Sequence, residues 1–371
     1  MAENVFARSA LDHRIYEVVL DDFAFTCAAA PGRITASPDL WISPAFIDLQ
    51  VNGFAGVDYN SPGASIDEID RSLGVIRRTG VASLLPTVIT GDGDHMIAAL
   101  RNLRQAQQRA SLGRMIAGFH VEGPHISPED GPRGAHPLQY VRLPDFNEFL
   151  KWQEATEGNI RVVTLSPHWE ESPRYIENVV AAGASVSIGH THASAAQIAE
   201  AVSAGASMST HLGNAAHPIL PKTSNYIWDQ LADDRLTASF IADGIHIPAG
   251  FLRSALRAKT IDRSVLVTDA SSPAGALPGR YKLGEQDVDL TVDGRVVMAG
   301  QNRLAGSALK LNEAVARVMR EAGLSLEEAL QLATTNPARA AHLEIPKEQI
   351  LFRLTSGRLD VLAMSAYREL P

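Results

Sequence analysis

The sequence has very little cysteine, no long apolar run and a deficit of basic residues. Cys27 is the one cysteine in 371 residues, so no internal disulfide can form, which fits a reducing compartment such as the cytoplasm. No basic amino-terminal segment precedes an apolar run, and no stretch reaches the roughly 18 apolar residues of a membrane-spanning helix. With 33 Lys and Arg against 42 Asp and Glu, the net charge of −9 disfavours binding to a phosphate backbone. We therefore expect a soluble cytoplasmic protein that binds neither membranes nor nucleic acids.

Short runs of β-branched and apolar residues alternate with longer amphipathic stretches through most of the chain. Eight runs of this kind lie at 45–51, 82–89, 115–121, 160–166, 184–188, 206–210, 237–242 and 264–268. The amphipathic stretches between them include 65–78, 95–111, 173–182, 194–204 and 249–258. Parallel strands joined by helical crossovers give this alternation, and eight such units are typical of a barrel of about 250 residues. The predicted fold class is α/β, with a (β/α)8 TIM barrel.

Both ends of the chain show strand character outside this alternation. Residues 16–20 and 23–27 precede the barrel, and residues 350–364 follow two predicted helices at 309–322 and 325–334. Ser325 and Glu328 have the spacing of a capping box at the start of the second helix. A β-hairpin is predicted over 281–298, because two strand-like runs flank Asp293 and Gly294. We divide the chain into a barrel, residues 45–345, and a small β-domain formed by residues 1–44 and 346–371.

Acidic, amide and imidazole side chains occur where most of the predicted strands end. In chain order they are Gln50, Asn52, Glu122, His190, His211, Asp243, His246 and Asp269. The carboxyl ends of parallel strands share one face of a barrel, so these side chains can converge. Each alone fits an ordinary role, since a histidine at a strand end is most often a hydrogen-bonded structural residue. Together, and with nine of the 12 histidines lying between residues 120 and 246, they predict a metal-dependent hydrolase.

Glu122, His190 and His211 form a set of two imidazoles and one carboxylate. Such a set suits a catalytic zinc ion whose fourth position is left to water. A bound ion lowers the pKa of its water towards 7 and polarises a carbonyl group. Asp269 is the predicted general base, which takes a proton from that water and returns it to an amine leaving group. We expect one divalent ion per chain, with Zn²⁺ first and Fe²⁺ or another divalent ion as the alternative.

Six segments in this order resemble the N-acetylglucosamine-6-phosphate deacetylases of the amidohydrolase superfamily. They are residues 120–124 (HVEGP), 189–191 (GHT), 210–215 (THLGNA), 241–246 (IADGIH), 267–270 (VTDA) and 304–309 (LAGSAL). The resemblance implies a (β/α)8 barrel with a small β-sandwich built from both chain ends, which looks abbreviated here. It also implies hydrolysis of the acetamido group of an amino sugar, most directly N-acetylglucosamine-6-phosphate, to glucosamine-6-phosphate and acetate.

Carried over residue by residue, the resemblance implies a complete set of site residues. Metal ligands are Glu122, His190 and His211, and the catalytic acid and base is Asp269. His136 is implied to help polarise the acetyl carbonyl. Contacts to the sugar and its phosphate are implied for Asn214, the Ala215 backbone and His246. The roles of His120, His125 and His217 stay open at this point.

The loop 217–224 departs from the family pattern, because it has no arginine for the phosphate of the neighbouring subunit. Lys222 can replace that arginine as a point charge but not as a planar bidentate donor. Two further alternatives therefore stay open, namely an amidohydrolase for an unphosphorylated N-acyl amino sugar or other amide, and a catalytically silent relative. Gln50 and Asn52 stand where two-metal relatives have His-x-His, which indicates a single metal ion. The resemblance also implies a homodimer.

Overall fold

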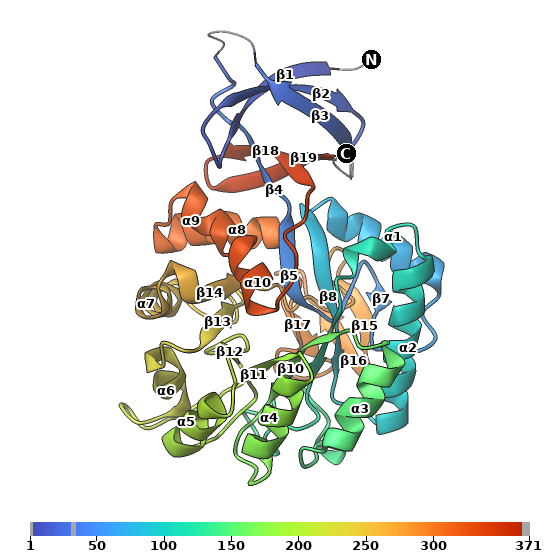
Figure 1. The fold of residues 1–371 in the computed structure, drawn as a ribbon, viewed down its shortest axis with the longest axis vertical. Helices are drawn as coiled ribbons and strands as arrows, with labels where there is room; N and C mark the ends of the chain where they lie inside the picture. Colours follow the sequence, from blue (N-terminus) through green and yellow to red (C-terminus); the bar gives the residue numbers. More distant parts are fainter. Residues whose placement is uncertain (1–2, 31–34, 366–371) are drawn as a thin grey trace.

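Eight parallel strands make the wall of the larger domain in this computed structural model, which describes residues 3–30 and 35–365 (Figure 1). In chain order they are β5 (Phe46–Val51), β8 (Val81–Ile89), β9 (Phe119–Glu122), β10 (Ile160–Leu165), β11 (Ser185–Ile188), β12 (Met208–Ser209), β13 (Thr237–Phe240) and β14 (Ser264–Leu266). Each strand pairs with the next one in this series, and every pair is parallel. The predicted (β/α)8 barrel is confirmed.

The seam between β5 and the end of β14 closes the barrel without a regular ladder. A single parallel bridge joins Val51 to Ala270, and the Asn52 N–H donates to the Ala270 carbonyl at 2.7 Å. The buried carboxylate of Asp48 also accepts from the backbone N–H of Thr268 at 3.2 Å and from its hydroxyl at 2.6 Å. This seam brings the first strand against the residues that follow the last one.

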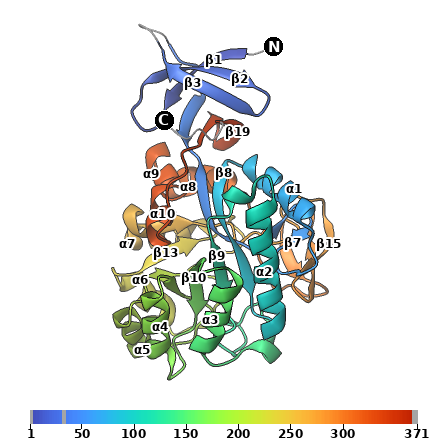
Figure 2. The same ribbon diagram turned by 45° about the vertical axis from the view of Figure 1, so that its right-hand side comes forward.

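Helices cover the outside of the barrel (Figure 2). They are α1 (Ile66–Arg77), α2 (Gly93–Arg109), α3 (Phe146–Ala155), α4 (Ser172–Ala181), α5 (Ala195–Ser203), α6 (Tyr226–Ala232), α7 (Ala249–Lys259) and α8 (Leu311–Ala322). In α2 the buried side chains Met96, Leu100 and Leu103 recur at helical spacing. The prediction missed α3 and the short α6, both of which begin after a side-chain cap, at Asp145 and Asn225.

Several predicted barrel strands are shorter than expected, and two of them differ most. The third begins at Phe119 rather than at Met115, because residues Gly113–Met115 form a 3-10 turn. The sixth is reduced to Met208–Ser209. The helix after Ser325 is α9 (Leu326–Gln331), its capping box with Glu328 is present, and a further helix, α10 (Thr335–Ala340), follows it.

The small domain combines strands from both ends of the chain, as predicted, and lies at one end of the long axis (Figure 1). Its strands are β1 (Glu3–Ser9), β2 (Ile15–Asp21), β3 (Ala24–Ala29), β4 (Leu40–Pro44), β18 (Gln349–Thr355) and β19 (Arg358–Ser365). They are hydrogen-bonded as one closed ring, in the order β1-β2-β3-β19-β18-β4, where two stacked sheets were expected. Val18, Phe25 and Leu351 are among the side chains that fill it.

A three-stranded sheet lies beside the carboxyl face of the barrel, where the sequence predicted a hairpin. It consists of β15 (Gly279–Leu283), β16 (Gln286–Leu290) and β17 (Val296–Met298). The predicted turn at Asp293 and Gly294 joins the second and third strands, and β15 is the strand that the prediction lacked. Leu283 and Val288 pack against Ile89 and Ala305, so this sheet covers part of the barrel mouth. A short pair, β6 (Gly53–Phe54) and β7 (Val57–Asp58), follows β5.

No helix in the described part of the chain is both long enough and apolar enough to span a bilayer.

Candidate active site

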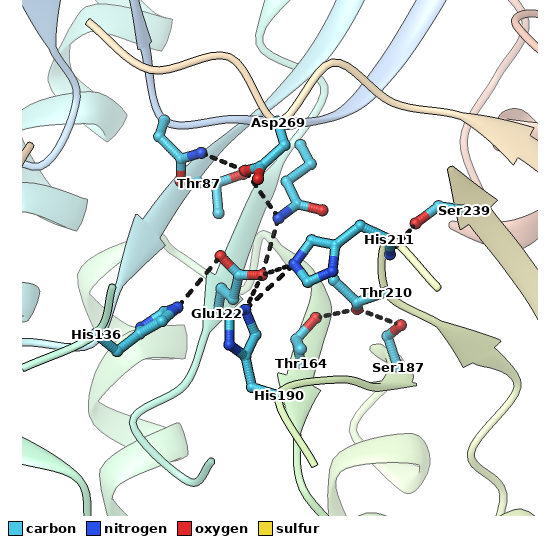
Figure 3. Close-up of polar contacts among 12 residues, drawn as sticks. Thr87, Glu122, His136, Thr164, Ser187, His190, Thr210, His211, Ser239 and Asp269 are labelled. Carbon is cyan, nitrogen blue, oxygen red and sulfur yellow. Dashed lines mark hydrogen bonds and ion pairs between the residues drawn. The ribbon is translucent and has the colours of Figure 1, made fainter. Parts of the chain in front are cut away.

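Side chains from the ends of five barrel strands meet at the carboxyl face (Figure 3). Glu122 is the last residue of β9, and His190 and His211 lie two residues beyond β11 and β12. Asp269 follows β14, and Gln50 lies in β5. All of these side chains are buried. The fold therefore brings together residues that are up to 219 positions apart in the sequence.

Three atoms of this cluster that could bind a metal ion lie close to one another. Glu122 Oε1 is 3.2 Å from His190 Nε2 and 3.0 Å from His211 Nε2, and the two imidazole nitrogens are 3.2 Å apart. Three ligands about 2 Å from one zinc ion, at tetrahedral angles, would lie about 3.3 Å apart. The triangle therefore has the size that a single cation requires.

The second nitrogen of His190 supports this arrangement. His190 Nδ1 lies 2.9 Å from the carbonyl oxygen of Pro132, so it carries the proton and donates it there. The lone pair of His190 is then on Nε2, which faces Glu122 and His211. A carbonyl partner that fixes the tautomer in this way is typical of metal-binding histidines. Two imidazole nitrogens and a carboxylate oxygen face one another here. This arrangement suits a divalent cation bound between them better than it suits direct contact among the three atoms.

The backbone is strained at the residues that carry this chemistry. His190, His211 and Asp269 have φ angles of 49°, 30° and 49°, in the left-handed region that non-glycine residues rarely adopt. Such conformations cost of order 1–3 kcal/mol each and persist where the surrounding structure enforces them. Their coincidence at three strand ends supports a functional role for this cluster.

His136 approaches Glu122 from the other side. Its Nε2 is 3.8 Å from Glu122 Oε2, and its Nδ1 is 2.8 Å from the Thr90 hydroxyl. Glu122, His136 and His190 can also present ligand atoms within 4.8 Å of one another, so a second donor set overlaps the first. The set with His211 has the shorter distances, and His136 faces the remaining oxygen. Burial lowers the pKa of His136 to about 3, so its imidazole is neutral near pH 7.

Charge is distributed unequally between the two carboxylates. Burial opposes ionisation of Glu122, but in the metal-free protein charge and hydrogen bonds from the facing imidazoles of His190 and His211 outweigh it and hold the pKa of Glu122 well below its usual range. For Asp269, burial and then the charge of Glu122 raise the pKa from 3.8 to about 6. Two neighbouring carboxyl groups with pKa values shifted in opposite directions are typical of sites that separate ligand and acid–base roles.

A buried polar network supports the cluster from below, and its hydroxyl groups were not predicted from the sequence. The Thr210 hydroxyl lies 2.7 Å from that of Thr164 and 2.6 Å from that of Ser187 (Figure 3). His120 joins it, with Nε2 2.8 Å from the Thr164 hydroxyl and Nδ1 3.1 Å from the Leu49 carbonyl. Both nitrogens of His120 are therefore occupied. Small hydroxyl residues at alternate positions of buried strands were the available signal.

The cavity over the cluster contains some of the predicted substrate residues. Its volume is about 60 Å³, and Asn214, Ala215, His246 and His136 line it together with Asp269. Small-molecule sites usually measure roughly 300–1,000 Å³. The cavity in this structure is therefore smaller than such sites, and Leu283 of β15 is among the residues that line it. A larger cavity of about 360 Å³ beside α8 is lined by Asp243 but by none of the predicted metal, acid–base or substrate residues.

Several residues singled out in the sequence do not reach this cavity. Lys222 is exposed on the loop before α6 and is absent from the lining. His125 is fully buried, and its ring packs against Trp152 and Tyr175, at 5.6 and 5.1 Å between ring centroids. His217 lies 2.9 Å from Glu129 outside the lining. Of the three histidines left open, only His120 therefore lies directly beneath the site.

A parallel barrel with a buried carboxylate–imidazole cluster at the carboxyl ends of its strands defines the class of this protein as a barrel hydrolase. The chain belongs to the amidohydrolase family, whose model matches residues 41–350. This family is metal-dependent, in agreement with the buried carboxylate and imidazole groups described above. The resemblance noted from the six sequence segments is thereby confirmed.

Comparisons with individual proteins agree with this assignment. The chain is 36% identical over 292 residues to the N-acetylglucosamine-6-phosphate deacetylase of Bacillus subtilis (strain 168), covering 78% of this chain and 72% of that protein. It is 31% identical to the N-acetylgalactosamine-6-phosphate deacetylase of Escherichia coli O157:H7, covering 88% and 85%. A variant of N-acetyl-D-glucosamine-6-phosphate deacetylase from Mycobacterium smegmatis, in complex with N-acetyl-D-glucosamine-6-phosphate, superimposes with a TM-score of 0.82 at 26% identity, covering 97% of this chain and all of that one.

Proposed function

We propose that this protein is a metal-dependent deacetylase that hydrolyses the acetamido group of an amino sugar 6-phosphate. The observation that carries the proposal is the 3.0–3.2 Å triangle of Glu122, His190 and His211 beside Asp269. Two similar proteins are deacetylases of N-acetylglucosamine-6-phosphate and N-acetylgalactosamine-6-phosphate, which supports the same substrate class. We expect the barrel of residues 45–345 to carry the reaction and the segments 1–44 and 346–371 to form the small domain. The single Cys27 agrees with a cytoplasmic location.

Glu122, His190 and His211 would hold one divalent ion. Two imidazoles and one carboxylate are the ligands of many catalytic zinc sites, although Fe²⁺ suits the same set. A bound ion would lower the pKa of a water molecule and polarise the acetyl carbonyl. Gln50 and Asn52 present carboxamides at the first strand, where a second ion would need imidazoles or carboxylates. We therefore propose one ion per chain.

Asp269 is the proposed acid and base. Oδ2 of Asp269 accepts no hydrogen bond from the described residues, whereas Oδ1 accepts two. Oδ2 would take a proton from the attacking water and return it to the amide nitrogen. The acyl C–N bond breaks, the acyl carbon gains the hydroxyl group, and the products are acetate and the free amine. His136, which burial keeps neutral, would donate from Nε2 to the acyl oxygen.

Asn214, the Ala215 backbone and His246 line the cavity and are the proposed contacts of the sugar and its phosphate. Lys222 would reach the phosphate only in a neighbouring copy, which is the role that the resemblance assigns to this loop. The same loop and the following helix expose Ile219 and Trp228, which are 88% and 51% accessible. A homodimer that buried these two side chains would remove their apolar surface from water. The proposal therefore includes a homodimer in which Ile219 and Trp228 are covered.

A second candidate is the same hydrolysis of an unphosphorylated N-acyl amino sugar. The observation in its favour is that the described lining of the cavity contains no lysine or arginine. Initial rates on N-acetylglucosamine-6-phosphate, N-acetylgalactosamine-6-phosphate and their unphosphorylated forms decide between the two. We expect kcat/KM to be highest on a 6-phosphate, and equal or higher values on the unphosphorylated sugars would contradict this. Absence of acetate release from all four substrates would contradict deacetylation itself.

A further inference from the structure

We propose that Gln50 and Asn52 are positioning residues that orient the Asp269 carboxylate for proton transfer. This inference rests on the proposed function and extends it to two side chains with no assigned catalytic role. Gln50 lies in β5, and Asn52 follows that strand directly. Both side chains are buried, with 1% of the surface of Gln50 and 2% of that of Asn52 accessible. Being two positions apart on an extended segment, they point to the same side, into the barrel.

The hydrogen bonds of these carboxamides converge on one oxygen atom. Asn52 Nδ2 donates to Asp269 Oδ1 at 2.7 Å, and Gln50 Nε2 donates to the same oxygen at 3.1 Å. Gln50 Nε2 also donates to Glu122 Oε1 at 2.9 Å, so both of its hydrogens are used. A carboxylate oxygen only accepts, which fixes the orientation of each amide. The two donors therefore hold Oδ1 and leave Oδ2 for the proton.

The backbone that carries these donors is itself fixed by the barrel seam. The N–H of Asn52 donates to the Ala270 carbonyl at 2.7 Å, and that of Val51 donates to the Thr87 hydroxyl at 3.1 Å. Asn52 Oδ1 is buried and has no hydrogen-bond partner in the described part of the chain. Among the described residues, the Asn52 side chain therefore makes a single hydrogen bond, the one to Asp269. A purely structural amide would be expected to satisfy both of its ends.

Gln50 also lies between two carboxylates with different roles. Its single nitrogen donates to the proposed ligand oxygen of Glu122 and to Asp269, so a neutral donor separates two groups that would otherwise repel each other. These two hydrogen bonds of Gln50 set the position of the Asp269 carboxylate relative to Glu122, the proposed metal ligand. In a buried site such a donor needs no reorganisation during the reaction.

Replacement of Asn52 tests this role. In Asn52→Ala we expect kcat to fall about 10- to 100-fold, as loss of a hydrogen bond to a charged group implies, with KM changed less than about twofold. Bound metal, measured by elemental analysis, should stay at the wild-type level. Asn102→Ala is the matched control, because Asn102 lies on α2, outside the cavity lining, and its amide donates to the Ala64 carbonyl. In this variant kcat should not change.

A double-mutant cycle separates positioning from a structural role. If Asn52 acts through Asp269, then Asn52→Ala should have little further effect on kcat in an Asp269→Asn background. An equal fold-loss in both backgrounds overturns the inference, and so does a parallel loss of bound metal or a wild-type kcat in Asn52→Ala. Gln50→Met, which keeps the side-chain length and removes the donor, serves as the second variant if Asn52→Ala does not fold. A wild-type protein without deacetylase activity overturns the proposed function, whereas an active wild type with an unaffected Asn52→Ala overturns the positioning role alone.

Discussion

Replacement of Asp269 by asparagine should make the metal-free protein more stable while it removes activity. The Asp269 side chain is buried, and its pKa is raised from 3.8 to about 6 because burial and the charge of Glu122 disfavour the ionised form. Between these pH values the folded state binds more protons than the unfolded state, so the free energy of unfolding falls as the pH rises. An asparagine at this position does not ionise, so the free energy of unfolding of the variant does not fall with pH for this reason.

The size of the effect follows from the two pKa values. The difference between 3.8 and about 6 corresponds to about 3 kcal/mol, at about 1.4 kcal/mol for each pKa unit. The stability gain of Asp269→Asn should therefore be about 0.5 kcal/mol at pH 4 and about 3 kcal/mol at pH 8. For 371 residues this is a rise in Tm of about 4 °C, given about 2.1 cal/mol/K of unfolding entropy per residue. Loss of an acid–base group should lower kcat by about 10²- to 10⁴-fold.

The assay is thermal unfolding of chelator-treated protein at pH 4 to 8, combined with acetate release by the metal-loaded enzyme. Asp58→Asn is the matched control, because burial also raises the pKa of Asp58 to about 6, and Asp58 does not line the cavity. Both oxygens of Asp58 accept backbone N–H groups, from Asn60 and Gly284, so Asp58→Asn loses one of these hydrogen bonds. It should therefore gain less stability at pH 8 than Asp269→Asn, and it should not show the large loss in kcat. Asp269→Asn with more than a tenth of the wild-type kcat, or with lower stability than wild type at pH 8, would refute the reasoning.

Three further predictions concern the metal, a helix cap and the phosphate. Elemental analysis should find one divalent ion per chain, and His211→Ala should lose it because the proposed ligand triangle is then incomplete; two ions per wild-type chain would contradict this. Ser65→Ala removes the hydroxyl that accepts from the Glu68 N–H in the α1 capping box and should lower the free energy of unfolding by about 1 kcal/mol in urea titrations, with kcat unchanged; no loss of stability would show that the cap is dispensable. Lys222→Ala should raise KM for a 6-phosphate substrate but not for the unphosphorylated sugar, and equal effects on both would exclude a phosphate contact.

The sequence predicted the barrel well because alternation of buried strands and amphipathic helices is a local signal. It predicted element boundaries less well, since the length of a strand such as Met208–Ser209 depends on which neighbours complete its hydrogen-bond ladder. The closed ring of the small domain was missed for a similar reason. Its first strand pairs with both β2 and β4, and no local pattern encodes that second pairing.

By itself, the sequence determined which chemical groups end the barrel strands, because side-chain type and spacing are local properties. Glu122, His190, His211 and Asp269 were recognisable in this way, and carboxamides at the first strand indicated a single ion. Only the tertiary structure decided distances between residues far apart in the chain. Closure of the barrel brings Asn52 to 2.7 Å from an aspartate 217 positions away, and burial raises the pKa of that aspartate. Contact and burial arise from packing of the whole chain, so no local pattern contains them.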